Sequence, residues 1–347
     1  MKHFFSFLLF AVAFSCNAQP VRELRLDATH IVYLLDSADA GRAITTDHLD
    51  QYFSLVNAGE MSIQMKRPLA AGQTRESLLP EYVDFLKKDV EGFSAADVEF
   101  TTGVMKKVFK TANEVDPAIF PDTLILIKTK GNHYGDGVWY TRENCIIIPA
   151  NELEARKTNA FTTTMYHELF HVWSRLNPAK SKQTYRLIGF EGIGLKNVQV
   201  PAGLAERVLY NPDGVDFAQK ISLTAADGKK IEAIPVIYSN NVGAKPGQNE
   251  FFGYLEFNLF EIRPGSDGTW QVITKDDGFS STLNLNELPD FFRQIKDNTG
   301  YIIHPDEVLA DNFSFIMVAK NSPTYTAKFS AEGKKLLADM EVLLKQK

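Results

Sequence analysis

The segment TNAFTTTMYHELFHVWSRLN, residues 158–177, contains two histidines spaced four residues apart, His167 and His171. The pair is unusual because the whole chain of 347 residues has only 7 histidines. On a helix, positions i and i+4 lie on one face, so both imidazoles would point to the same place. Apolar residues recur through the segment with the period of a helix, namely Met165, Leu169, Val172, Trp173 and Leu176. The pattern predicts a helix with one buried face and both histidines on another.

The pentapeptide HELFH, residues 167–171, has the spacing of a metal site. A catalytic zinc ion keeps three protein ligands and a water, and imidazole nitrogen is one of its preferred ligands. Glu168, next to the first histidine, is placed to reach the water rather than the metal. Zinc lowers the pKa of that water to about 7, so the carboxylate can take its proton. The sequence therefore predicts one zinc ion on His167 and His171, with Glu168 as general base. The alternative is a pair of core or surface histidines without a metal.

A third ligand is expected further along the chain. The sixth residue after the second histidine is an asparagine, which excludes a third histidine at that spacing. The segment HPDEVLADN, residues 304–312, places Glu307 and Asp311 one helical turn apart. Glu307 could bind the metal while Asp311 accepts the spare N–H of a ligand histidine. Asp306 lies about 100° around the helix from Glu307, so we expect it to face away and to complement the helix dipole.

The two motifs together resemble the gluzincin metallopeptidases, the broad group that contains thermolysin. The resemblance covers the two helices and the strands expected before the first of them. It implies zinc bound by His167, His171 and Glu307, with Glu168 as general base. It also implies that a peptide substrate pairs with an edge strand, which we place within residues 138–149. The interval between the two motifs is longer than in thermolysin, and too few residues follow the second for thermolysin's C-terminal helical domain. The resemblance is therefore to the group, and distant from thermolysin itself.

Three further residues could belong to the same site. His304, Tyr301 and His133 could stabilise an oxyanion or contact the substrate. For His304 the alternative is a cap of the helix that begins at the following proline. Arg175 is interpreted as a surface ion-pair partner, and the segment NPDG, residues 211–214, as a turn without further function.

The residue patterns predict an α+β fold. The core would be zincin-like, a mixed sheet plus the motif helix, and a β-rich insertion would separate the two metal-binding helices. We expect a signal peptide at 1–18, a largely helical region at 19–120, the catalytic core at 121–194 and 276–347, and the insertion at 195–275.

The N-terminal segment MKHFFSFLLFAVAFSCNA has the basic start, apolar run and small residues of a secretory signal peptide. We expect an exported protein, periplasmic or secreted. The alternative is an outer-membrane lipoprotein, because Ala13–Cys16 resembles a loose lipobox and Cys16 would carry the lipid anchor. No later apolar run approaches the roughly 18 residues of a transmembrane helix.

The composition narrows the class of function. A net charge of -6 argues against nucleic acid as a partner. Cys145 is the only cysteine if Cys16 is removed, so no internal disulfide is expected, and Cys145 itself is read as a buried strand residue. These observations predict an exported zinc metallohydrolase, a peptidase acting on a peptide or protein substrate. The alternative is a catalytically inactive zincin-fold module that binds or supports other molecules in the cell envelope.

Overall fold

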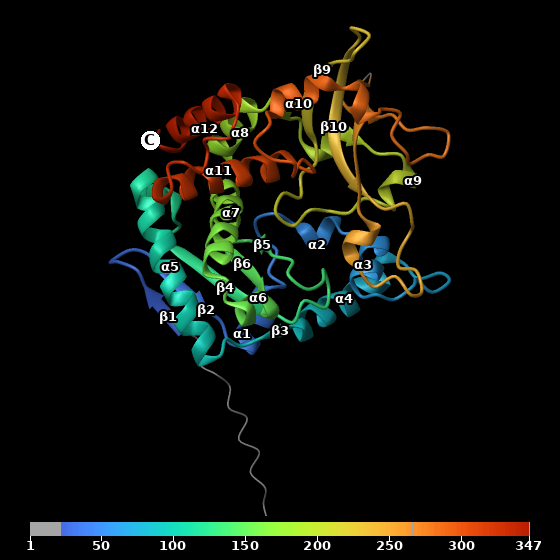
Figure 1. The fold of residues 1–347 in the computed structure, drawn as a ribbon. Coiled ribbons are helices and arrows are strands. Elements are labelled where there is room, and N and C mark those ends of the chain that lie inside the picture. Colours follow the sequence, from blue (N-terminus) through green and yellow to red (C-terminus); the bar gives the residue numbers. More distant parts are fainter. Residues whose placement is uncertain (1–21, 266, 347) are drawn as a thin grey trace, which may run out of the picture.

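The computed structural model describes residues 22–265 and 267–346, and in this part of the chain two six-stranded sheets are accompanied by twelve α-helices (Figure 1). The strands of the first sheet are β1 (Arg22–Arg25), β2 (Ile31–Leu34), β3 (Val90–Glu91), β4 (Thr123–Thr129), β5 (Tyr140–Arg142) and β6 (Cys145–Pro149). The strands of the second sheet are β7 (Phe190–Gly192), β8 (Val198–Gln199), β9 (Gln219–Thr224), β10 (Lys230–Tyr238), β11 (Glu256–Pro264) and β12 (Trp270–Val272). The helices are α1 (Ser37–Ala43), α2 (Tyr52–Leu55), α3 (Ala58–Gln64), α4 (Arg75–Asp89), α5 (Ala95–Val115), α6 (Ala150–Ala155), α7 (Thr158–Leu176), α8 (Pro178–Leu187), α9 (Ala202–Ala205), α10 (Pro289–Ile295), α11 (Pro305–Asn321) and α12 (Ala331–Leu344). The predicted α+β class is confirmed.

The first sheet has the order β1-β2-β4-β6-β5, and β3 pairs with β4 beside this path. Its centre, β2-β4-β6, is parallel, whereas β5 is an antiparallel edge strand on β6. All five residues of β6 are buried, as expected for a strand covered on both faces. Three short strands of this sheet, β1 to β3, come from the region 19–120 that was predicted to be largely helical, and the five helices α1 to α5 lie in the same region. The strands were not predicted, because β2 pairs with β4 across a long interval, Ile31 opposite Thr123, which local patterns do not reveal.

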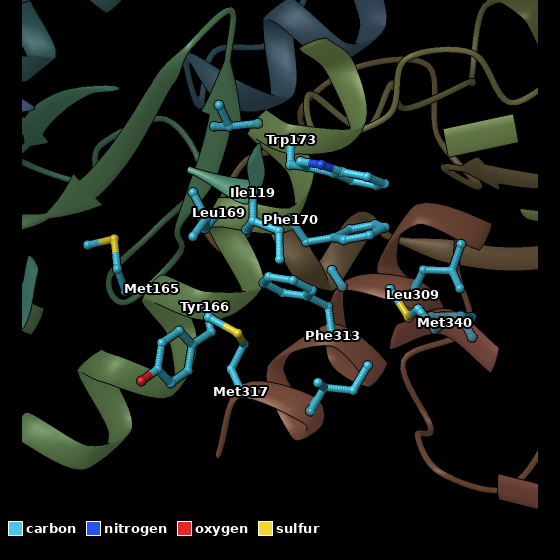
Figure 2. Packing of buried hydrophobic residues seen from close by; sticks show 14 of the residues in the cluster. Ile119, Met165, Tyr166, Leu169, Phe170, Trp173, Leu309, Phe313, Met317 and Met340 are labelled. Carbon is cyan, nitrogen blue, oxygen red and sulfur yellow. The ribbon is translucent and has the colours of Figure 1, made fainter. Parts of the chain in front are cut away.

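Helix α7 lies against β5 and β6, and α5 and α11 pack on it (Figure 1). The contact between α7 and α11 is apolar and aromatic, with the rings of Phe170 and Phe313 5.6 Å apart (Figure 2). Met165, Leu169 and Trp173 of α7 are buried in the same apolar cluster, as the helical period predicted. This packing fixes the orientation of both helices and therefore of the side chains on their other faces.

The second sheet has the order β7-β9-β10-β11-β12-β8 and lies in the middle of the chain, between α8 and α10. Strands β9 and β10 pair in antiparallel register on either side of Asp227-Gly228 and form a hairpin. Gly228 has a φ of 85°, a conformation that favours glycine at a tight turn. The sheet begins at Phe190, slightly before the predicted boundary of the insertion at 195.

A second apolar cluster joins α1–α4 to β6 and to parts of the second sheet. Glu60 is buried inside it, where it accepts hydrogen bonds from Tyr52, Gln64 and the backbone N–H of Tyr210. Burial nevertheless raises the pKa of Glu60 to about 7. Burial likewise raises the pKa of the Cys145 thiol to about 12, consistent with its predicted place in a strand.

Within the described residues, no helix is both long and apolar enough to cross a membrane. The predicted signal peptide at 1–18 and Cys16 lie outside the described residues.

Candidate metal centre

Two crossing helices, α7 and α11, position the side chains of the site (Figure 1). The apolar face of α7 is held in the core, which turns His167 and His171 towards α11 with their ring centroids 4.7 Å apart. Oε2 of Glu307 lies 3.0 Å from Nε2 of His167 and 3.4 Å from Nε2 of His171. One ligand atom from each of the three residues lies within 4.8 Å of the others. The three side chains predicted to bind zinc are therefore brought to one place.

The Nδ1 atoms of both histidines face carboxylates of α11. Nδ1 of His167 is 2.9 Å from Oδ1 of Asp311, and Nδ1 of His171 is 2.7 Å from Oδ2 of Asp306. A carboxylate at Nδ1 keeps the ring proton on that nitrogen and leaves the lone pair of Nε2 free. This is the tautomer that a metal ligand requires.

Asp306 does not face away from the site, contrary to the sequence-based expectation. Besides its contact with His171, it accepts hydrogen bonds of 2.7 Å from Ser174 and 2.8 Å from the Tyr185 hydroxyl. Because α7 and α11 cross, His171 meets the first turn of α11 while His167 meets the next. The rotation of about 100° between Asp306 and its neighbour therefore does not separate Asp306 from the histidines.

Two buried polar atoms of this centre have no hydrogen-bond partner in the described part of the chain, Nε2 of His171 and Oε2 of Glu168. Leaving a buried polar atom unpaired costs about 1–3 kcal/mol, so such atoms call for an explanation. A cation beside Nε2 of His171 would supply one. The donor set of two imidazole nitrogens and one carboxylate oxygen also fits zinc.

The electrostatics of the centre favour positive charge beside the histidines. Burial lowers the pKa of His167, but hydrogen bonds to Asp311 and Glu307 outweigh burial and raise it to about 10. Burial raises the pKa of Glu307, yet the two histidines hold it well below its usual value. Burial, together with the charge of Asp213, raises the pKa of Glu168 to about 8. The carboxylates thus stabilise a charge of the sign that a divalent cation carries.

The turn at residues 211–214 enters the centre from the β-rich part of the chain. Nδ2 of Asn211 donates a hydrogen bond of 2.6 Å to Oε1 of Glu307. Ligand atoms of Asp213, Glu168 and His171 lie within 4.8 Å of one another. Sequence reasoning missed both residues of the turn, because the pattern NPDG indicates a turn wherever it occurs and does not show where the turn packs.

Arg175 fixes this turn in place. Its guanidinium donates to the backbone oxygens of Pro212, at 2.9 Å, and Asp213, at 3.3 Å, and lies 3.3 Å from the carboxylate of Asp50. The side chain is only 9% exposed, so the interpretation of Arg175 as a surface ion-pair partner is wrong.

The three further candidates have different surroundings. Tyr301 lies at the site, with its ring stacked at 6.1 Å on that of His167. His304 caps α11 by accepting a hydrogen bond of 3.1 Å from the backbone N–H of Asp306, so the structure places it in the alternative role. His133 is buried between Asp89 and the Tyr140 hydroxyl and does not line the cleft at the metal centre. Neither His304 nor His133 is thus positioned to contact a substrate.

A cleft of about 410 Å³ opens onto the centre. Its walls include His167, Glu168 and Glu307, together with Trp139 from the segment before β5 and Tyr301. The strand predicted to pair with a substrate, β5, therefore begins beside this cleft. Comparison of the chain with protein-family models, with curated proteins and with solved structures finds no match.

Proposed function

We propose that this protein is a zinc-dependent metallohydrolase with a zincin-like core, and that it hydrolyses peptide bonds. The observation that carries the proposal is the convergence of two imidazole Nε2 atoms on Glu307 while carboxylates hold both Nδ1 atoms. Such an arrangement leaves two lone pairs and one carboxylate directed at a single point. It is the coordination that the resemblance to gluzincins implied.

Each residue has a distinct task in this proposal. His167, His171 and Glu307 would hold one zinc ion, and Asp311 and Asp306 would keep the imidazoles in the required tautomer. Zinc, when bound, acidifies a coordinated water and polarises a carbonyl oxygen. Glu168 would take the proton of that water, and its buried, unpartnered Oε2 is available for it. Tyr301, at the edge of the cleft, would contact the substrate or its oxyanion.

The proposal is tested by the Glu168→Gln variant. Glutamine keeps the size of the side chain but cannot take a proton. We expect zinc to remain bound, as measured by elemental analysis, and turnover of a cleaved peptide to fall by roughly 10²–10⁴-fold. Glu154→Gln, an exposed position in α6, serves as the matched control and should retain full activity.

The alternative of an inactive binding module predicts another outcome. Purified protein would contain zinc but would cleave no member of a peptide library. A protein that binds no zinc would refute both readings.

A further inference from the structure

We propose that Asp213 binds a positively charged ammonium group of the substrate beside the metal centre. The inference rests on the proposed function, because that function places a peptide in the cleft. The ammonium group could be the free amino terminus of a peptide or a lysine side chain. The structure favours the amino terminus, for reasons that come from the hydrogen bonds of Asp213, the charge of the cleft and the edge of β5.

The carboxylate of Asp213 has one free oxygen next to the reacting groups. Oδ1 accepts both the backbone N–H of Thr141, at 2.6 Å, and the Thr141 hydroxyl, at 2.7 Å. Oδ2 makes no hydrogen bond to any described residue, although Asp213 lines the cleft. None of the tasks assigned to the metal centre uses this oxygen. Oε2 of Glu168 nearby is also buried and unpartnered, so two acceptors at this place lack donors.

The negative charge that lines the cleft favours a second cation in addition to a metal ion. Five carboxylates face the cleft, those of Glu152, Glu168, Asp213, Glu307 and Asp311, and no lysine or arginine of the described residues does. One divalent ion would not neutralise them. A substrate that brings an ammonium group would therefore be attracted, and a negatively charged one would be repelled.

The edge of β5 explains why the ammonium group would be a peptide terminus. The N–H of Thr141 is used by Asp213 rather than by β6, so it marks the outer edge of the sheet. An extended peptide that adds to this edge needs such N–H groups. Because Asp213 already occupies the one at Thr141, the added strand must stop there. The end of the added strand would then lie beside the Asp213 carboxylate. The α-ammonium group at the amino terminus of a peptide can pair with that carboxylate through a charge-assisted hydrogen bond.

The test measures binding separately from hydrolysis. The Glu168→Gln variant, loaded with zinc, would leave a peptide intact, so affinities can be measured by fluorescence anisotropy. Three labelled peptides of one sequence are compared: one with a free amino terminus, one N-acetylated, and one N-acetylated with lysine in place of the first residue. The same peptides are then titrated against Glu168→Gln combined with Asp213→Asn. Asparagine can still accept the Thr141 hydrogen bonds but carries no charge.

We expect the free amino terminus to bind roughly tenfold or more tightly than the acetylated one, and Asp213→Asn to abolish the difference. Glu152→Gln, which removes an equal charge elsewhere in the cleft, should retain the preference. Preference for the acetylated lysine peptide alone, again lost in Asp213→Asn, would support the ammonium site with the side chain as its source. Equal binding of all three peptides, or a preference that survives Asp213→Asn, would overturn the inference. Zinc content near one ion per chain and hydrolysis of a peptide by the wild-type protein are measured separately, and they test the proposed function. Loss of the amino-terminus preference in a protein that passes both measurements would therefore overturn this inference alone.

Discussion

At the scale of single residues, the two histidines depend on the carboxylates behind them. We expect Glu307→Ala to lose zinc almost completely, because it removes a proposed ligand. Asp311→Ala and Asp306→Ala should each weaken zinc binding by roughly 10–100-fold, because each frees one imidazole to rotate or change tautomer. Competition with a chromogenic chelator measures these affinities. His304→Ala is the control: it removes a helix cap and should lower the melting temperature while zinc content stays near normal. Loss of zinc in His304→Ala with retention in Glu307→Ala would reverse the assignment.

Glu60 should give the protein a pH-dependent stability. Its pKa is about 7 in the folded protein against 4.5 for an ordinary glutamate, so the folded state binds the proton more tightly. The resulting stabilisation is fully present below about pH 4.5 and is lost as the pH rises through 7, by about 3 kcal/mol in all. Between pH 5 and pH 8 the wild-type protein should therefore lose more stability than Glu60→Gln does. Denaturant titrations at both pH values measure the difference.

A matched control separates this effect from other titrating groups. Glu76→Gln changes an exposed glutamate in the first turn of α4 and should follow the wild-type pH dependence. A Glu60→Gln variant that loses as much stability as the wild type between the two pH values would show that Glu60 does not titrate in this range.

At the scale of helices and strands, the sequence predicted the elements whose signals are local. Helices α5 and α7 are recognisable because their apolar period is contained in the segment, and α5 also begins with a local capping box formed by Ser94 and Asp97. The short strands β1 and β2 carry no such signal, because their stability comes from pairing with each other and with β4. Only the folded chain reveals those partners.

The packing of α7 on α11 should couple stability to metal binding. Phe313→Ala leaves a cavity against Phe170 and should cost about 3–5 kcal/mol of unfolding free energy. It should also weaken zinc binding, because the carboxylates of α11 would be held less firmly against the histidines. Val342→Ala, at an exposed position of α12, should change neither quantity. Calorimetry and chelator competition check the two effects, and a destabilised Phe313→Ala protein with unchanged zinc affinity would contradict the coupling.

At the scale of the whole molecule, the candidate metal centre joins parts of the chain that are far apart in sequence. Removing zinc with a chelator should increase amide hydrogen exchange in α7 and α11, which carry the proposed ligands. We also expect faster exchange at 209–215, because the Asn211 side chain donates a hydrogen bond to Glu307, one of the proposed ligands. The hairpin tip around Asp227, whose carboxylate accepts a hydrogen bond from the backbone N–H of Lys229 within the turn, supplies none of the proposed ligands and should exchange equally in both states. Mass spectrometry of peptic fragments measures all of these segments, and unchanged exchange at 209–215 would mean that the turn is held independently of the metal.

The separation of the site residues along the sequence explains which parts of the candidate site could be predicted. His167 with His171, and Glu307 with Asp311, are pairs within one helix, so their spacing is visible in the sequence. Asn211 meets Glu307 across 96 residues, and nothing in its immediate neighbours indicates the contact. The direction of the Asp306 side chain was predicted wrongly because the crossing of two helices is a property of the packed molecule rather than of either segment.

The reactivity of the buried Cys145 thiol can report on opening of the first sheet. The side chain is 2% exposed in a strand between β4 and β5, and its high pKa keeps it as the unreactive thiol. An alkylating reagent can therefore reach it only during the moments when the sheet comes apart. The rate of labelling at Cys145, read by mass mapping of its peptide, therefore measures how often the sheet opens. Comparing this rate with and without zinc would show whether a metal ion held by α7 and α11 slows the opening of a sheet that carries none of the proposed ligands.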